Sequence, residues 1–149
     1  KGAMLNGRSI HVSGKNDTQE SVVSTGFPID KDRNPDNNLD NLARILPMVR
    51  GVRRQGSAAF DLCCVAAGIL DGYWEFNLHL WDVCAGILIV TEAGGTVRSF
   101  REDRNVSIVA GTPAIVRQAG EDMSLNELLL RFFIIPGTIL RLFLYFCNR

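Results

Sequence analysis

Apolar residues recur along the chain in two patterns, one with the period of a helix and one typical of strands. Helical spacing runs through residues 39–49, 58–69 and 83–93. Short runs that favour strands lie between and around these segments, at 21–25, 52–55, 72–80, 95–100 and 106–110. Strands that alternate with helices predict an α/β protein, or an α+β layered sandwich.

Turn-forming residues mark the ends of several of these segments. Asn6-Gly7 between two short runs predicts a two-residue hairpin turn. The polar stretch 30–38 contains a proline and is expected to be a loop. Pro47 fits a helix interior poorly and should end the first helix early. Thr112-Pro113 offers an N-cap followed by proline at the first helical position, which predicts another helix start.

The segment from Leu80 to Gly95 combines an apolar helical pattern with a carboxylate near its start. Asp82 follows Trp81 and is expected to be the N-cap of a helix that ends at Gly94-Gly95, where positive φ is cheap. A carboxylate at that position suits the unpaired N–H groups and the dipole of the helix. Asp82 therefore reads either as an ordinary helix cap or as a group that carries chemistry.

The amino-acid composition limits which molecules the chain is expected to bind and which cellular compartment suits it. The formal net charge is zero, with both signs scattered, so no basic stripe marks a nucleic-acid surface. Four cysteines form no C-x-x-C pair, which favours a reduced, cytoplasmic setting. His11 and His79 have no second ligand at metal spacing. The chain begins at Lys1, without a signal-peptide pattern, and reads as a piece of a longer protein.

The final segment, 119–149, is much more apolar than the rest of the chain. A spanning helix needs about 20 mostly apolar residues, but Arg131 and Arg141 would each cost about 2.5–3.5 kcal/mol in a bilayer. A membrane anchor is therefore disfavoured. The alternatives are a helix that packs on the core or on a partner subunit, and a tail of foreign origin.

Four motifs occur in order and at close spacing. They are GVRRQGSAA at 51–59, AAGILDGYWE at 66–75, Trp81-Asp82 and EAGG at 92–95. Together they resemble the C-terminal half of the inositol monophosphatase family of magnesium-dependent sugar phosphatases, over residues 1–118. Phe27 after Thr25-Gly26 is similar to bacterial members. The resemblance implies the second half of a layered α-β-α-β-α sandwich.

The resemblance also implies roles for individual residues. Asp82 matches an aspartate that binds a metal beside the substrate hydroxyls, Glu75 matches a glutamate that binds the sugar, and Gly56-Ser57-Ala58 matches a turn that lines the substrate pocket. The residues alone also allow simpler interpretations. Glu75 would then be an exposed strand glutamate, and Gly56-Ser57-Ala58 would be a plain turn with a serine cap. The connection from Phe76 to His79 departs from the glycine-containing one usual in the family.

Two hypotheses follow for function. In the first, the whole protein removes phosphate from inositol monophosphate or a related sugar phosphate with Mg²⁺, usually as a homodimer. The family's Gly-Glu-x-Glu and Asp-Pro-x-Asp-Gly-Thr metal and phosphate motifs do not occur in this sequence, so the isolated chain is expected to be inactive. In the second, the chain is a non-catalytic truncated homologue that acts as a dimerisation or interaction module.

Overall fold

The centre of the molecule is a five-stranded mixed sheet. The computed structural model describes residues 2–101, 103 and 105–119. The strands are β3 (Val22–Thr25), β4 (Gly51–Arg53), β5 (Gly72–Leu78), β6 (Thr96–Ser99) and β7 (Val106–Gly111), in the spatial order β4-β3-β5-β7-β6. Strand β3 runs parallel to both β4 and β5, whereas β7 runs antiparallel to β5 and β6. The carboxyl ends of β4, β3 and β5 therefore meet at one edge of the sheet.

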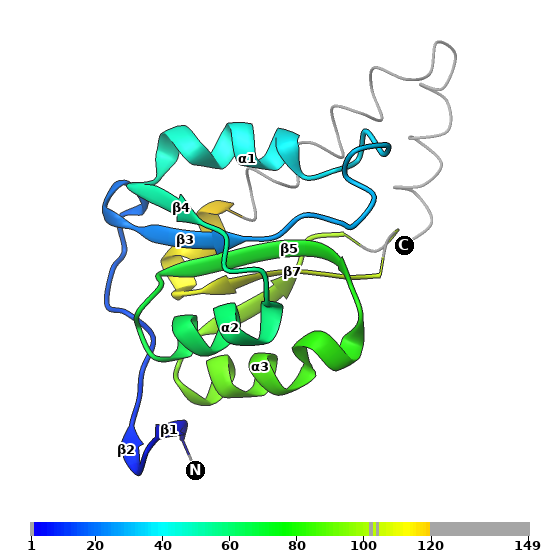
Figure 1. Cartoon of the computed structure of the whole chain (residues 1–149). Helices are drawn as coiled ribbons and strands as arrows, with labels where there is room; N and C mark the ends of the chain where they lie inside the picture. The colour runs from blue at the N-terminus through cyan, green and yellow to red at the C-terminus, as the bar shows by residue number, and fades with distance from the viewer. Residues whose placement is uncertain (1, 102, 104, 120–149) are drawn as a thin grey trace, which may run out of the picture.

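Helices cover both faces of this sheet (Figure 1). Helix α1 (Leu39–Ile45), which continues as a 3-10 turn at Leu46–Met48, lies on one face, and α2 (Ala58–Ala66) and α3 (Leu80–Glu92) lie side by side on the other. Residues 113–119 form one further helical segment. This arrangement confirms the predicted α/β layered sandwich.

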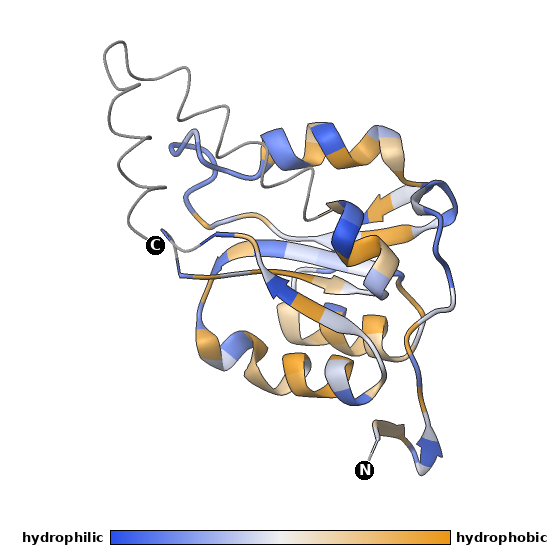
Figure 2. Ribbon diagram, turned by 180° about the vertical axis from the view of Figure 1, so that it is seen from behind, coloured by the Kyte–Doolittle hydropathy of each residue, from blue (hydrophilic) through white to orange (hydrophobic). Residues whose placement is uncertain are grey.

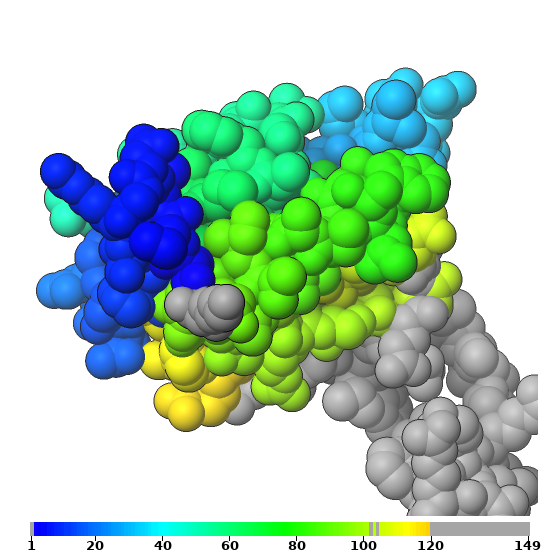
Figure 3. Space-filling view, turned by 90° about the horizontal axis from the view of Figure 1, so that it is seen from below, coloured from blue at the N-terminus to red at the C-terminus, as the bar shows by residue number. Residues whose placement is uncertain are grey.

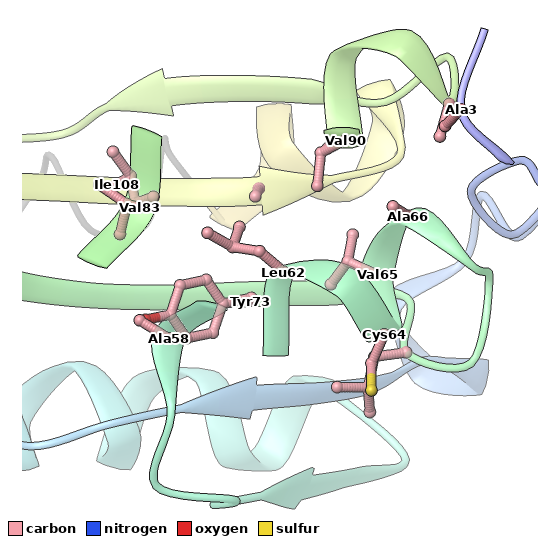
Figure 4. Close-up of a cluster of buried hydrophobic side chains, with 13 residues drawn as sticks. Ala3, Ala58, Leu62, Cys64, Val65, Ala66, Tyr73, Val83, Val90 and Ile108 are labelled. Atoms are coloured by element: carbon pink, nitrogen blue, oxygen red, sulfur yellow. The ribbon is translucent and has the colours of Figure 1, made fainter. Parts of the chain in front are cut away.

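Strand β5 shows how one sequence fills both layers, because successive side chains of a strand point to opposite faces. Tyr73 belongs to the core between the sheet and α2 and α3, together with Leu62, Val83 and Ile108 (Figure 4). Its neighbour Trp74 belongs to the second core, on the α1 side of the sheet. The strand predicted at 72–80 is therefore confirmed as β5, although it ends at Leu78, and both of its faces are buried.

The N-terminal residues form a small hairpin beside α3. Strands β1 (Met4–Leu5) and β2 (Arg8–Ser9) pair antiparallel, and Asn6 and Gly7 take the positive φ values of 51° and 79° that a two-residue turn requires. Ala3 N–H donates to Glu92 O at 3.3 Å, which attaches the hairpin to the end of α3. Figure 3 shows the hairpin and the two helices forming one continuous surface. The predicted Asn-Gly turn is confirmed.

Most helix boundaries agree with the turn signals. Leu46–Met48 forms the 3-10 turn with Pro47 inside it, and Gly94 follows α3 with a φ of 82°. Thr112 Oγ1 accepts a hydrogen bond from Ile115 N–H at 3.3 Å, as an N-cap should. The polar stretch 30–38 is a loop and stands out as hydrophilic against the largely hydrophobic α2 and α3 (Figure 2).

Several residues of the predicted apolar faces are exposed instead, among them Leu39 and Leu46 of the first helix. Ile69 was expected on the buried face of the second helix, but α2 ends at Ala66 and Ile69 is 69% exposed. Leu88 was expected on the buried face of the third helix but is 63% exposed, because that helix turns Val83, Gly86 and Val90 inward. Helical spacing alone does not show which of two adjacent apolar stripes faces the sheet.

No helix long and apolar enough to cross a membrane occurs within the part of the chain that the structure describes. The apolar tail considered as an anchor, residues 119–149, lies outside the described residues except for Ala119.

Candidate functional site

A pocket lies where the three parallel strands end. It has a volume of about 430 Å³ and is lined by Gly26, Phe27, Arg54, Gly56, Ser57, Ala58, Ala59, Glu75, Leu78, Trp81 and Asp82. The residues after β3 and β4 and the second half of β5 contribute to its lining. Helices α2 and α3 begin at the pocket. Open α/β sheets bind ligands at this edge, outside the carboxyl ends of their strands. All five residues predicted for the site line this one pocket.

Glu75 lies on β5 and is held from two sides. Tyr73 Oη donates a hydrogen bond to Glu75 Oε2 at 2.6 Å. On the other side, the backbone of Gly26 approaches so closely that a Cβ at that position would overlap the carboxyl group. Burial raises the pKa of Glu75, and the charges of Asp61 and Asp82 raise it further, whereas the Tyr73 hydrogen bond and Arg54 oppose the rise. Glu75 is therefore not the exposed strand glutamate of the alternative interpretation.

The wall opposite Glu75 is the turn that starts α2. Gly56 has a φ of 85°, a conformation that favours glycine. Ser57 is the N-cap residue, and its Oγ accepts a long hydrogen bond of 3.4 Å from Phe60 N–H. Ser57 thus acts as the predicted cap and as a pocket residue at once. The unpaired N–H groups at the start of α2 favour an anionic ligand group here.

Asp82 lies in the first turn of α3, so its predicted place at a helix N-terminus is confirmed, but the prediction that it is the N-cap was wrong. The N-cap is His79, the helix begins at Leu80, and Asp82 occupies the third helical position. Asp82 Oδ2 accepts the His79 N–H at 3.1 Å, the reciprocal half of a capping box. The helix therefore starts two residues before Asp82. From the first turn, the Asp82 carboxylate satisfies the N–H of His79, which is the N-cap. Asp82 still lines the pocket.

Trp81 lines the pocket but is not part of the core. It is 75% exposed and stacks on His79, with ring centroids 4.3 Å apart and the planes 13° from parallel. The connection before it contains Asn77 with a φ of 62°, at an irregularity in the pairing of β5 with β7. Asparagine tolerates this left-handed conformation better than most residues. Asn77 therefore supplies the conformation that a glycine would otherwise provide in this connection.

Sequence reasoning missed Asp61, a buried carboxylate near the start of α2. It lies in the first turn of α2, is 1% exposed, and accepts a hydrogen bond from Ser24 Oγ at 2.6 Å. Burial raises its pKa, and hydrogen bonds from Ser24 and Gln55 partly offset the rise. The available signal was its position: Asp61 falls between Ala58 and Leu62 on the buried stripe of the helix.

We expect Asp61→Asn to change how stability depends on pH. Because the native pKa is raised above the ordinary value of 3.8, the stability that Asp61 contributes is complete below that value and is lost as pH rises through the native pKa. Asparagine has no charge to desolvate. The free energy of unfolding of Asp61→Asn relative to the native chain should therefore rise over the pH range that begins at about 3.8 and extends through the native pKa. Urea titrations across this range, with Asp40→Asn as an exposed control, check the prediction, and parallel pH curves would contradict it.

Asn38 supports the chain after β3, where Gly26 and Phe27 line the pocket. It is buried, and its Nδ2 donates to Thr25 Oγ1 at 2.9 Å and to Gly26 O at 2.7 Å. Its Oδ1 accepts Trp74 Nε1 at 3.0 Å. One side chain thus joins the loop before α1, the end of β3 and the opposite face of β5, and fixes the backbone of Gly26 beside Glu75.

The oxygen donors at the pocket decide whether a metal ion fits there. Magnesium prefers oxygen ligands, usually one or two carboxylates with waters and substrate phosphate. Among the described residues, no group of three or more His, Cys, Asp or Glu side chains is placed to hold a metal. Asp82 is one candidate ligand, and one of its oxygens already accepts the His79 N–H. The described residues do not form a complete metal site.

A mixed sheet covered by helices on both faces, with a polar pocket at the carboxyl ends of its parallel strands, defines a layered αβ sandwich with a ligand site at the sheet edge. A sequence profile of the inositol monophosphatase family matches residues 1–130, and the chain belongs to that family.

Known relatives agree with this assignment. The chain is 48% identical over 99 residues to an inositol-1-monophosphatase from Synechocystis sp. The aligned residues make up 66% of this chain and 34% of the relative. It is 43% identical over 122 residues to a protein from Neisseria meningitidis serogroup B that is named putative Nus factor SuhB. The aligned residues make up 79% of this chain and 47% of that relative. The chain thus spans less than half the length of these two relatives.

Solved structures show the same fold. The inositol monophosphatase from Anabaena (Nostoc) sp. PCC 7120 superposes with a TM-score of 0.78 at 37% identity, over 83% of this chain and 51% of that one. The extragenic suppressor protein suhB from Bartonella henselae gives a TM-score of 0.73 at 38% identity, over 83% and 48% of the two chains. About half of each structure therefore corresponds to this chain.

Proposed function

We propose that the whole protein hydrolyses the phosphomonoester of inositol monophosphate or a related sugar phosphate with Mg²⁺. In this proposal the chain supplies the sugar-binding side of the active site. The observation that carries it is the meeting of Glu75 and Asp82 in one pocket, at the N-termini of α2 and α3. The inositol-1-monophosphatase name of a relative 48% identical supports the substrate class.

The roles follow from the chemistry of the side chains. An ionised Glu75 accepts hydrogen bonds from two adjacent sugar hydroxyls, an arrangement that recognises a polyol. The N–H groups of the Gly56-Ser57-Ala58 turn bind anionic oxygens of the ligand. Asp82 serves as one metal ligand beside the sugar. Bound Mg²⁺ would activate water and stabilise charge on the phosphate and on the leaving oxygen.

The chain by itself should be inactive. Its described residues lack a complete metal site, and two carboxylate motifs of the family are missing from the sequence. We infer that the catalytic site is complete only when these motifs are present in the same protein or in an associated one. Among the described residues, Cys63, Cys64 and Cys84 are free thiols, which supports a cytoplasmic setting.

Calorimetric titration of the purified chain tests the retained half of the site. Inositol monophosphate with Mg²⁺ should bind saturably, with a dissociation constant of about 1 mM, equivalent to about −4 kcal/mol. Asp82→Asn should abolish the part of the binding that depends on Mg²⁺ and leave weak metal-independent binding. Asp40→Asn is the matched control, since Asp40 also lies in the first turn of a helix, α1, away from the pocket. A chain that binds no ligand at any Mg²⁺ concentration would refute the proposal.

The second function, a non-catalytic interaction module, is favoured by a different observation. Phe60 and Leu88 are exposed on the helical layer, and apolar surface of this kind can mark a protein interface. The family resemblance implies a homodimer. Sedimentation of the same samples separates the two functions: concentration-dependent association without saturable ligand binding favours the module, and ligand binding favours the retained site.

A further inference from the structure

The hydroxyl of Tyr73 orients the carboxylate of Glu75. Tyr73 lies two residues earlier on β5, so both side chains point to the same face of the sheet. Its Oη donates to Glu75 Oε2 at 2.6 Å, a short charge-assisted bond. Tyr73 itself does not line the pocket.

The tyrosine is anchored far more firmly than the glutamate. Its side chain is 1% exposed and belongs to the core that contains Ala58 and Leu62 of α2 (Figure 4). Burial and the neighbouring Glu75 charge raise the pKa of the phenol far above its usual range, so it remains a donor at any ordinary pH. A rigid donor thus holds a side chain that would otherwise have three free torsions.

Gly26 restricts Glu75 from the opposite side, because a Cβ there would overlap the carboxyl group. The other charged groups that act on Glu75 are Asp61 from α2, Asp82 from α3 and Arg54 from the segment before α2. None of these makes a hydrogen bond to Glu75 among the bonds found in the described residues, and Tyr73 does.

We propose that Tyr73 is a positioning residue, whose hydroxyl fixes one carboxylate oxygen of Glu75 so that the remaining lone pairs accept a polyol ligand. This inference rests on the proposed function in one respect, that Glu75 binds the sugar. The hold of Tyr73 on Glu75 is independent of any ligand and can be measured without one.

The experiment compares Tyr73→Phe with the native chain. Carbon-13 NMR of labelled glutamate, assigned with Glu75→Gln, should show the pKa of Glu75 rising in Tyr73→Phe, because the lost hydrogen bond favoured the charged form. The affinity for inositol monophosphate should fall several-fold. Ser21→Ala is the control: it removes a buried hydroxyl that donates to Asp17 O before β3, at the end of the strand away from the pocket, and it should leave the pKa of Glu75 unchanged.

A second measurement covers the case in which Tyr73→Phe fails to fold. The Cζ resonance of Tyr73, one of only two tyrosines, should titrate with Glu75 in the native chain and lose that titration in Glu75→Gln. A flat Tyr73 resonance, or an unchanged Glu75 pKa in Tyr73→Phe, would overturn the inference. If Tyr73 and Glu75 titrate together but the native chain binds no inositol monophosphate, the contact stands and the proposed function fails.

Discussion

Replacing Leu62 with alanine is expected to lower the free energy of unfolding by about 2–5 kcal/mol, the usual cost of deleting a buried leucine. Leu62 is fully buried and lies at the centre of the core between the sheet, α2 and α3 (Figure 4). Because small domains are stable by only about 5–15 kcal/mol, the loss would be a large share of the total. Urea unfolding followed by circular dichroism measures it.

The contact between Leu62 and Gly86 makes this prediction sharper. A Cβ at Gly86 would lie 2.6 Å from Leu62 Cδ1 and 2.7 Å from its Cβ, so the two helices approach at this glycine. Gly86→Ala alone should destabilise the chain by about 1–3 kcal/mol through overpacking. In the Leu62→Ala background its cost should be smaller, because the Cδ1 atom is gone.

Gly14→Ala is the matched control, since nothing lies within 4 Å of a Cβ there. Its free energy of unfolding should stay within about 0.5 kcal/mol of the native chain, as for most surface substitutions. Strictly additive effects of Leu62→Ala and Gly86→Ala would show that the two residues are not in contact.

The elements of the fold could be predicted because their signals are local. Asn6-Gly7 and Thr112 each specify a turn or a cap through neighbours within three residues. The start of α3 was misplaced by the same kind of reasoning, because Asp82 at the third helical position contacts the N-cap as readily as an N-cap aspartate would contact the third position. An aspartate at the N-cap and an aspartate at the third helical position produce the same sequence pattern. Only the backbone conformation distinguishes them.

The contacts that shape the site were beyond such signals. Ser24 and Asp61 are 37 residues apart, and Asn38 reaches Trp74 over 36. Which strands become neighbours decides these pairs, and hydrophobic periodicity does not encode the strand order. The ordered motifs placed Glu75 and Asp82 in one pocket by resemblance, but nothing in a Thr-Gly-Phe run shows that its glycine lies against a carboxylate.

Gly26→Ala is expected to separate ligand binding from folding. The atoms that its Cβ would overlap belong to the far end of Glu75, a flexible side chain, and Gly26 does not have a positive φ. The strand can therefore stay in place while Glu75 leaves Tyr73. The free energy of unfolding should fall by about 1–3 kcal/mol, the cost of leaving the buried Tyr73 hydroxyl unpaired.

The affinity for inositol monophosphate should fall about tenfold or more, because a hydrogen bond to a charged group contributes about 1.5–3 kcal/mol and each 1.4 kcal/mol is a factor of ten. Calorimetry on Gly26→Ala, Glu75→Gln and the double variant Gly26→Ala/Tyr73→Phe measures it, with Gly14→Ala as the control. Once the Cβ of residue 26 has displaced Glu75, Tyr73 has nothing to position, so the double variant should bind no more weakly than Gly26→Ala alone. A further loss of affinity in the double variant would mean that Tyr73 acts on the ligand by another route, and native affinity in Gly26→Ala would mean that Glu75 does not bind the sugar from the position in which Tyr73 holds it.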